Sequence, residues 1–459
     1  MKTGVNFSHT PSAPGSRPNA ARIKLTAVFW LSVYLALVIT PLLVLTLAPV
    51  PAKGGFLWDS GMGFGFCGLV MLVLQFFITA RLRKPVAPFG IDVIYYFHRY
   101  LAYAMLLVVL AHPLLLLFSK PAMLTRFDLQ SLSWPLLSGV LSLLLLLLVV
   151  ISSAWRRQLN IAYDQWRVLH LLLALAVVVL AFIHMWGIHY YSAPPPVKSL
   201  WIAIALSLAL IVLHVRLLRP LRVSRCPWQL AAIRKERGDC WTLTLQPQGH
   251  PGIAFQAGQF CWLSINHSPF SMQEHPFSIA SAPQDNGSLQ FTIKALGDFT
   301  QAIGNTPAGS TVFVDGPYGV FSCERHEDAA GYIFISGGIG LAPMLGMLQA
   351  LAQKSDARPH ILFTAHSEWD RIPRREEIFA LTEKLQLTIV PILEHTPPDW
   401  QGEQGYLDLE MLKRYLPENF RDYEVFMCGP QAMLDAARKS LRQLQMPAVQ
   451  IHSELFDMA

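Results

Sequence analysis

Long stretches without charged side chains constrain the fold of this chain more than any other feature of its sequence. A helix needs about 20 apolar residues to cross the hydrocarbon core of a bilayer, which is roughly 30 Å thick. Five of six such stretches reach that length, and the sixth reaches it if Arg216 extends its charged end to the interface. We therefore predict a membrane-embedded, multi-pass bundle of six transmembrane helices. The stretches are 25–52, 60–80, 100–119, 129–155, 168–197 and 199–215.

The two halves of the chain differ in charge. Residues 1–220 contain 17 Lys and Arg but only four Asp and Glu, whereas residues 221–459 contain 19 and 26. The pI near 9.0 is thus an average over two parts that meet different solvents. This composition excludes a single soluble domain and a disordered chain, and the pI by itself does not indicate a nucleic-acid partner.

Basic residues between the apolar stretches predict how the chain is oriented in the membrane. With a cytoplasmic N-terminus, twelve Lys and Arg flank the helices on the cytoplasmic side, against only Lys53, Lys120, Arg126 and Lys198 on the other. We therefore predict a protein of the cell (inner) membrane with both termini in the cytoplasm. Residues 1–21 are polar and precede no small-residue cleavage site, so we expect a flexible cytosolic tail rather than a signal peptide.

Four histidines occur in matching positions of two predicted helices. His98 and His112 lie at the third stretch, His170 and His184 at the fifth, and both gaps are 14 residues. Fourteen residues are two heptads, so both side chains stay on nearly one face, roughly 21 Å apart along the axis. Two such helices present opposed imidazoles at two depths. This geometry predicts metal ligands for two b-type haems that transfer electrons; ordinary hydrogen bonds between helices are the alternative.

Two arginines lie next to these histidines. Arg99 follows His98 directly, and Arg167 precedes His170 by one helical turn. Guanidinium groups there would pair with haem propionates. Their charged ends would equally reach the membrane interface without any cofactor.

The second half of the chain has two patterns. Residues 226–325 alternate as short strands with Gly and Pro turns, which favours a small barrel. From Gly331, strands alternate with helices, which indicates a parallel α/β sheet. The glycine turn at 337–340 follows a strand and precedes a helix, so it is either a phosphate-binding turn or a plain tight turn. None of the six cysteines forms a Cys-x-x-Cys pair, which excludes a plant-type iron–sulfur domain.

In this order, the features resemble the ferric reductase and NADPH oxidase superfamily, in its bacterial form of a transmembrane flavocytochrome b with a ferredoxin-NADP reductase-like cytosolic half. The resemblance extends from about residue 22 to 459. Beside the four histidines, it rests on HPFSIAS at 275–281, IKALGDFTQAI at 293–303, DGPYG at 315–319, GGIGLAP at 337–343, CGP at 428–430 and ELF at 454–456.

The resemblance implies a fold class of a six-helix membrane domain plus a cytosolic β-barrel FAD domain and an α/β nucleotide-binding domain. After the tail, the expected domains are 22–220 for the transmembrane haem domain, 221–325 for FAD and 326–459 for NAD(P). The implied cofactors are FAD, two b-type haems and NADPH or NADH.

The resemblance also implies roles for single residues, with Ser278, Cys428 and Phe456 in the catalytic set. Residues expected around the flavin ring and its phosphates are His275, Pro276, Phe277, Ser278, Lys294, Gly297 and Thr300. Residues expected around the dinucleotide phosphates and the nicotinamide are Gly337, Gly338, Gly340, Pro343, Cys428, Gly429 and Pro430. Glu454 and Phe456 would shield the flavin or stack on it. His275 stands where soluble relatives carry Arg, which leaves its phosphate contact open.

The implied activity is electron transfer from cytosolic NAD(P)H through FAD and two haems to a small-molecule acceptor on the outer face, either a ferric chelate or O2. Arg371, Arg374 and Arg375 would bind the 2′-phosphate of NADPH, or they form a solvated helix start. Two alternatives remain at this point. One is an electron-donor module for a periplasmic protein, and the other is a membrane-anchored flavin reductase without haem. The sequence predicts no nucleic-acid partner and no particular oligomeric state.

Overall fold

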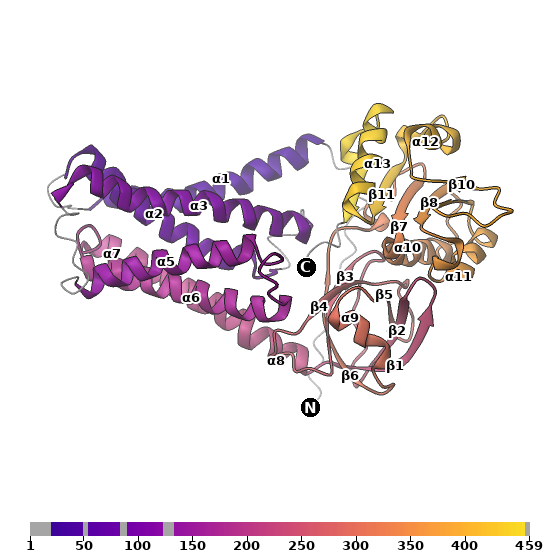
Figure 1. The fold of residues 1–459 in the computed structure, drawn as a ribbon, viewed down its shortest axis with the longest axis horizontal. Coiled ribbons are helices and arrows are strands. Elements are labelled where there is room, and N and C mark those ends of the chain that lie inside the picture. The colour runs from indigo at the N-terminus through magenta and orange to yellow at the C-terminus, as the bar shows by residue number, and fades with distance from the viewer. Residues whose placement is uncertain (1–19, 49–53, 83–89, 123–132, 455–459) are drawn as a thin grey trace. The chain divides into compact units, whose positions relative to one another are not determined.

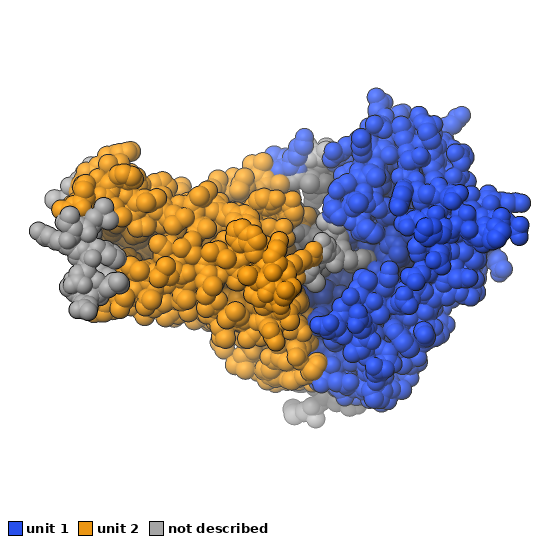
Figure 2. Space-filling view, viewed as in Figure 1, with its two compact units in different colours: residues 1–25, 226–266, 275–458 blue, residues 26–225, 267–274, 459 orange. Residues whose placement is uncertain are grey.

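A computed structural model describes residues 20–48, 54–82, 90–122 and 133–454 of the 459-residue chain. It divides into two compact units, coloured separately in Figure 2. The first, here called the membrane unit, comprises 26–225 together with the short segment 267–274. The second, here called the reductase unit, contains 226–266 and 275–458.

The membrane unit consists of helices that are apolar on every side. Six helices of the described chain are long and apolar enough to span a bilayer, which confirms the predicted number. Side chains such as Leu107 and Phe118 point outward and are 69% and 73% exposed, as expected for a surface that faces lipid. The helices are α1 Ala20–Thr46, α2 Phe56–Ile78, α3 Ile91–Ser119, α5 Trp134–Ala154, α6 Tyr163–Ile188 and α7 Pro195–Leu213, labelled in Figure 1.

The sixth span is longer than the sequence suggested. A π-helical turn, His214–Leu218, follows α7 and leads into α8, Arg219–Ser224. Pro220 comes just after this π-helical turn, and its nitrogen carries no hydrogen to donate to the preceding turn. Arg219 donates to the carbonyl of Ala80 at 3.2 Å, which ties this end of the span to the end of α2.

The first half of the reductase unit is a curled antiparallel sheet of six strands in the order β4-β3-β6-β1-β2-β5. A bridge between Ile279 and Phe291 joins the two ends of the order, so the sheet closes on itself as the predicted small barrel. Alternating apolar side chains, among them Leu243, Leu263 and Phe291, fill its interior. The elements are β1 Pro227–Glu236, β2 Cys240–Pro247, β3 Phe260–Ile265, β4 His275–Ser278, β5 Leu289–Lys294, α9 Asp298–Ala302 and β6 Thr311–Tyr318.

The second half of the reductase unit is a parallel α/β sheet in the order β10-β9-β8-β7-β11-β12. Its central strands are buried on both faces and read as continuous apolar runs, which is typical of parallel sheets. The strands are β7 Tyr332–Gly337, β8 His360–His366, β9 Leu387–Leu393, β10 Glu403–Gln404, β11 Glu424–Cys428 and β12 Ile451–Glu454. The main helices are α10 Leu341–Gln353, α11 Arg375–Ala380, α12 Leu409–Tyr415 and α13 Gln431–Gln443.

Candidate functional site

The four histidines predicted as metal ligands form two opposed pairs. The ring centroids of His98 and His170 are 6.3 Å apart, and those of His112 and His184 are 6.1 Å apart. A transition metal binds an imidazole nitrogen at about 2 Å, so two rings on opposite sides of one metal have centroids roughly 6 Å apart. Helices α3 and α6 therefore hold each pair at the separation that a shared metal requires.

In three of the four paired histidines, hydrogen bonds determine which ring nitrogen keeps its lone pair. Nδ1 of His112 lies 2.8 Å from the carbonyl oxygen of Gly61, and Nδ1 of His184 lies 2.8 Å from that of Pro135. A carbonyl only accepts, so each Nδ1 carries the proton and each Nε2 keeps its lone pair. Nδ1 of His170 lies 3.1 Å from the hydroxyl of Ser153, which donates its own proton to Val149 and so accepts from the ring. Metal-binding histidines usually donate their other ring N–H to an oxygen in this way, which orients the ring toward the metal.

Two glycines make room for the second pair. A Cβ at Gly65 of α2 would lie 2.7 Å from Nδ1 of His112, and one at Gly139 of α5 would lie 2.5 Å from Nδ1 of His184. Each ring therefore occupies space that any larger residue on the neighbouring helix would fill. Sequence reasoning did not single out either glycine.

Arg167 binds a carboxylate within the membrane unit. It donates to the backbone carbonyl and to Oε1 of Glu274, both at 2.9 Å, and Arg81 donates to the same Oε1 at 2.7 Å. Burial raises the pKa of Glu274, but the guanidinium groups outweigh burial and lower it to about 2. The carboxylate is thus ionised at neutral pH. Arg99 is exposed on α3. Sequence reasoning missed Glu274, which precedes the flavin sequence HPFS directly.

Strand β4 carries the residues expected around a flavin ring. Ser278 is buried, and its hydroxyl has no hydrogen-bond partner among the described residues. A buried hydroxyl without a partner is costly, so it marks a position where a ligand completes the site. His275 stacks on Phe299 of α9 with centroids 3.9 Å apart, and Phe277 lies 6.3 Å from the same ring. The imidazole at position 275 therefore extends an aromatic stack.

The turn into α9 is held by one hydroxyl. Oγ1 of Thr300 accepts from the backbone N–H groups of Leu296 and Gly297, both at 2.9 Å. The first N–H groups of a helix lack partners inside it, so this turn presents donors suited to phosphate oxygens. Lys294, at the end of β5, pairs in register with Cys240 and places a cation close to the turn.

The glycine turn lies where the order of the parallel sheet reverses. The chain runs outward on one side through β7, β8 and β9, whereas β11 lies on the other side of β7. In such sheets, ligands bind at the carboxyl ends of the strands at this switch point. The described structure brings Gly337 and Gly338 together here with Gly429 and Pro430. A Cβ at Gly429 would lie 2.9 Å from the amide nitrogen of Gly337.

Open space remains above this turn. Gly338 has a φ of +55°, and a Cβ there would meet nothing within 4 Å. Gly340, in contrast, packs so tightly that a Cβ would lie 2.1 Å from the carbonyl oxygen of Cys428. Pro343 is buried in the first turn of α10. Tight packing at Gly340 together with open space at Gly338 suits the binding of a dinucleotide pyrophosphate to this turn.

Cys428 and Glu454 face each other across adjacent strands. They are partners in the register of β11 and β12, and both are buried. Burial, and next the neighbouring Glu454 carboxylate, raise the pKa of the Cys428 thiol well above its ordinary value, so the thiol stays protonated. The remaining predicted residue, Phe456, lies outside the described residues.

The three arginines near the second strand of the nucleotide-binding sheet have different environments. Arg374 is buried, and it donates to the carbonyl of Ala280 and to Oε1 of Gln290, both at 2.8 Å. It also pairs with Glu377, so it joins the two halves of the reductase unit. Arg375 lies over the ring of Trp369 at 4.5 Å. Arg371 is half-exposed and is the one of the three that solvent reaches most freely.

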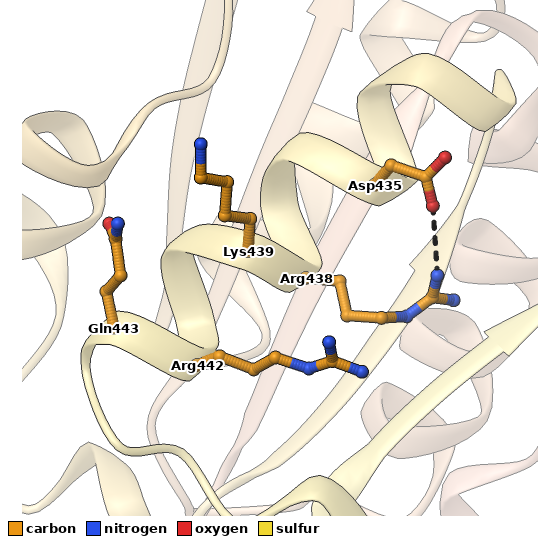
Figure 3. Close-up of a pocket in the computed structure, with 5 residues that line it drawn as sticks. All are labelled: Asp435, Arg438, Lys439, Arg442 and Gln443. Carbon is orange, nitrogen blue, oxygen red and sulfur yellow. Dashed lines mark hydrogen bonds and ion pairs between the residues drawn. The ribbon is translucent and has the colours of Figure 1, made fainter.

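A basic depression lies on helix α13, away from the predicted residues. Figure 3 shows Arg438 and Arg442 extending from the same side of the helix. Arg438 donates to Asp435 at 3.2 Å and to the hydroxyl of Ser453 at 2.9 Å, so it holds β12 against the helix. The depression is lined by Asp435, Arg438, Lys439, Arg442 and Gln443.

Three family models match consecutive parts of the chain. The ferric reductase like transmembrane component matches residues 64–182, the FAD-binding domain matches 229–322 and the oxidoreductase NAD-binding domain matches 334–439. The first range contains His98, His112 and His170 and ends two residues before His184. The second range contains β4 and α9, and the third contains the glycine turn.

Single relatives match the reductase half. The electron transfer component of xylene/toluene monooxygenase from Pseudomonas putida is 31% identical over 199 residues, which is 42% of this chain and 55% of that protein. NADH-cytochrome b5 reductase 1 from Mortierella alpina is 27% identical over 198 residues, 42% of this chain and 65% of that protein. The chain thus spans between half and two thirds of the length of these curated relatives.

Among solved structures, the ferredoxin reductase of carbazole 1,9a-dioxygenase is 25% identical, with a TM-score of 0.45 over 50% of this chain and 69% of that one. The decisive finding is the order of the three family models on one chain, together with six apolar helices. The chain is therefore a membrane protein of ferric reductase/NADPH oxidase-like architecture, in which a ferric reductase like transmembrane domain precedes an FAD-binding domain and an NAD-binding domain.

Proposed function

We propose that this protein is a transmembrane oxidoreductase that carries electrons from cytosolic NAD(P)H through FAD and two b-type haems to an acceptor on the outer face of the inner membrane. The observation that carries the proposal is the pair of opposed imidazole couples on α3 and α6, with centroids 6.3 Å and 6.1 Å apart. The donor sets fit the group, since each pair offers two imidazoles, which are ligands of haem iron, at a separation that one metal ion would require.

Bis-histidine ligation suits electron transfer rather than substrate binding at the iron. When bound, FAD supplies the chemistry that accepts a hydride from the nicotinamide and releases its electrons singly to haem iron. The chain's own part is to hold these groups. His98 and His170 would hold one haem, and His112 and His184 the other, with Gly61 and Pro135 fixing the tautomers of the second pair.

In the reductase unit, the expected roles follow the described geometry. The hydroxyl of Ser278, which has no hydrogen-bond partner among the described residues, would meet the flavin ring. The backbone N–H groups of the first turn of α9, which follow Gly297 and include Thr300, would bind the flavin phosphates. The turn at Gly337–Gly340 would bind the dinucleotide pyrophosphate. Cys428, a protonated thiol at the same crevice, would flank the nicotinamide without acting as a base. In this proposal the electron donor is either NADPH or NADH.

The outer acceptor is a small molecule in this proposal, either a ferric chelate or O2. With both termini in the cytoplasm, electrons leave the cell, and a negative interior favours this direction by about 2.3 kcal/mol per 100 mV. A periplasmic electron-accepting protein is the second candidate for the acceptor, because relatives of the reductase half are named as electron transfer components.

Spectra of the purified protein test the proposal. Reduction with dithionite should give b-type haem bands with two haems per chain, and NAD(P)H should give the same bands. Consumption of NAD(P)H with ferric citrate, with O2 or with neither then separates the acceptors. A preparation that contains flavin but no haem would overturn the proposal and leave a membrane-anchored flavin reductase. Haem reduction without turnover on either small molecule would favour the periplasmic protein.

A further inference from the structure

Three side chains of the reductase unit converge at a point that the proposed electron path does not use. Oε2 of Glu424 lies 2.7 Å from Nε2 of His452 and 3.7 Å from Nδ1 of His326. The three ligand atoms all lie within 4.8 Å of one another. Glu424 begins β11, His452 lies in β12, and His326 follows the last strand of the barrel. Cys428 marks the opposite end of β11, so the cluster is separate from the nucleotide crevice.

Because the cluster is buried, the charge of Glu424 and the ring nitrogen of His326 need a partner that water does not supply. The side chain of Glu424 is 4% exposed and that of His326 is 9% exposed, and Nδ1 of His326 has no hydrogen-bond partner among the described residues. A carboxylate out of water needs a compensating positive charge, and a buried ring nitrogen needs a partner. One cation between the three side chains would satisfy both requirements.

The donor set indicates the class of cation. Two imidazoles and one carboxylate are ligands that Zn²⁺ and similar divalent transition metals prefer. Two ligands of a tetrahedral ion at about 2 Å lie roughly 3.3 Å apart. This value lies between the distances from Oε2 of Glu424 to Nε2 of His452, 2.7 Å, and to Nδ1 of His326, 3.7 Å. The side chain of His452 is 21% exposed, which leaves a route for the ion and room for water as a fourth ligand.

We propose that His326, Glu424 and His452 form a binding site for one Zn²⁺-class divalent cation. The ion joins three segments that are distant in sequence: the connection after the barrel, strand β11 and the edge strand β12. Because Glu454 follows His452 by two residues, the ion fixes the strand that holds this carboxylate beside Cys428. The site does not depend on the proposed haem or flavin chemistry.

Zinc binding to the full-length protein in detergent tests this site. Chelator-treated protein is titrated with Zn²⁺ in competition with a chromogenic zinc indicator. Wild type should bind one more equivalent than His326→Asn, Glu424→Gln and His452→Asn, or bind it at least tenfold more tightly. His395→Asn, which changes an exposed histidine outside the cluster, should behave as wild type. Equal stoichiometry and affinity in all five proteins would overturn the proposal.

A second measurement needs no variant and therefore does not depend on variants that fold. Zn²⁺ should protect His452 of the wild-type protein from carbethoxylation by diethylpyrocarbonate, as read by peptide mass spectrometry, and should leave His395 reactive. Zn²⁺ should also raise the thermal unfolding temperature, since an ion that binds only the folded chain stabilises it. Unchanged labelling of His452 at saturating Zn²⁺ would reject the site even if zinc binds elsewhere.

Discussion

Gly65 of α2 lies directly against the imidazole of His112 on α3. A Cβ at position 65 would come within 2.7 Å of Nδ1, closer than the protein interior permits. The relationship recurs between Gly139 of α5 and His184 of α6, at 2.5 Å. Both glycines therefore belong to the proposed haem site, although neither would touch the iron.

Alanine at either glycine should displace the adjacent imidazole. In Gly65→Ala the methyl group pushes His112 away from Gly61 and from its partner ring, so we expect loss of about one of the two proposed haems. Quantitative haem analysis of the purified protein measures this loss. Gly63→Ala is the matched control on the same helix, because its Cβ would meet Leu42 at an ordinary 3.4 Å. Full haem content in Gly65→Ala and in Gly139→Ala would contradict the expectation.

Gly340→Ala should separate nucleotide binding from flavin binding. The new methyl group would meet the carbonyl of Cys428 at 2.1 Å, so β7 and β11 must move apart at the crevice. We expect NAD(P)H-dependent flavin reduction to fall by roughly tenfold or more, which corresponds to about 1.4 kcal/mol. FAD content should stay at the wild-type level, because the turn lies outside the barrel. Stopped-flow flavin reduction measures the effect, and an unaltered rate would exclude this role of Gly340.

Arg374→Ala should destabilise the reductase unit without altering coenzyme choice. Each nitrogen of this buried guanidinium already donates to Glu377, Ala280 or Gln290. Removing one partner of a buried ion pair costs about 3 kcal/mol. Thermal unfolding should show the loss, while the ratio of NADPH to NADH activity stays constant. Arg371→Ala, at a half-exposed position, should cost less than about 1 kcal/mol. A changed ratio in Arg374→Ala at unchanged stability would show that the coenzyme contacts this arginine.

The contribution of Glu274 should depend on pH in a defined direction. Its pKa is lowered from the ordinary 4.5 to about 2, so the folded protein favours the ionised form more than the unfolded chain does. The stabilisation is therefore complete above pH 4.5 and is lost as the pH falls from 4.5 towards 2. Glu274→Gln removes the carboxylate that pairs with Arg81 and Arg167 and should cost about 3 kcal/mol at neutral pH.

Unfolding temperatures of wild type and Glu274→Gln between pH 8 and pH 3 measure this dependence. The difference between the two proteins should be constant down to about pH 5 and shrink below it. Glu418→Gln, at an exposed position, serves as the control and should show little difference at any pH. A difference that persists unchanged to pH 3 would exclude the ion pairs as its source.

Periodic signals allowed much of the architecture to be predicted. The charge-free stretches gave six spans because a bilayer imposes one length on every helix. The alternation of strands and helices after Gly331 gave the parallel sheet because parallel strands require a crossover between them. The sixth span was the exception, since it continues through Arg216, Pro220 and two further arginines to Ser224, beyond the point where the charge pattern ended it.

The residues of the candidate site likewise fall into two groups: those that the sequence predicts and those that only the structure identifies. The sequence by itself determined the four histidines, the glycine turn and the flavin strand, because 14-residue spacing and local strand–turn–helix patterns act over short stretches of chain. Only the tertiary structure decided that Gly65 accommodates His112, that Glu274 binds Arg167, and that Glu424 meets two histidines more than 25 residues away on either side. Such contacts depend on which surfaces pack together, and no local periodicity records that packing.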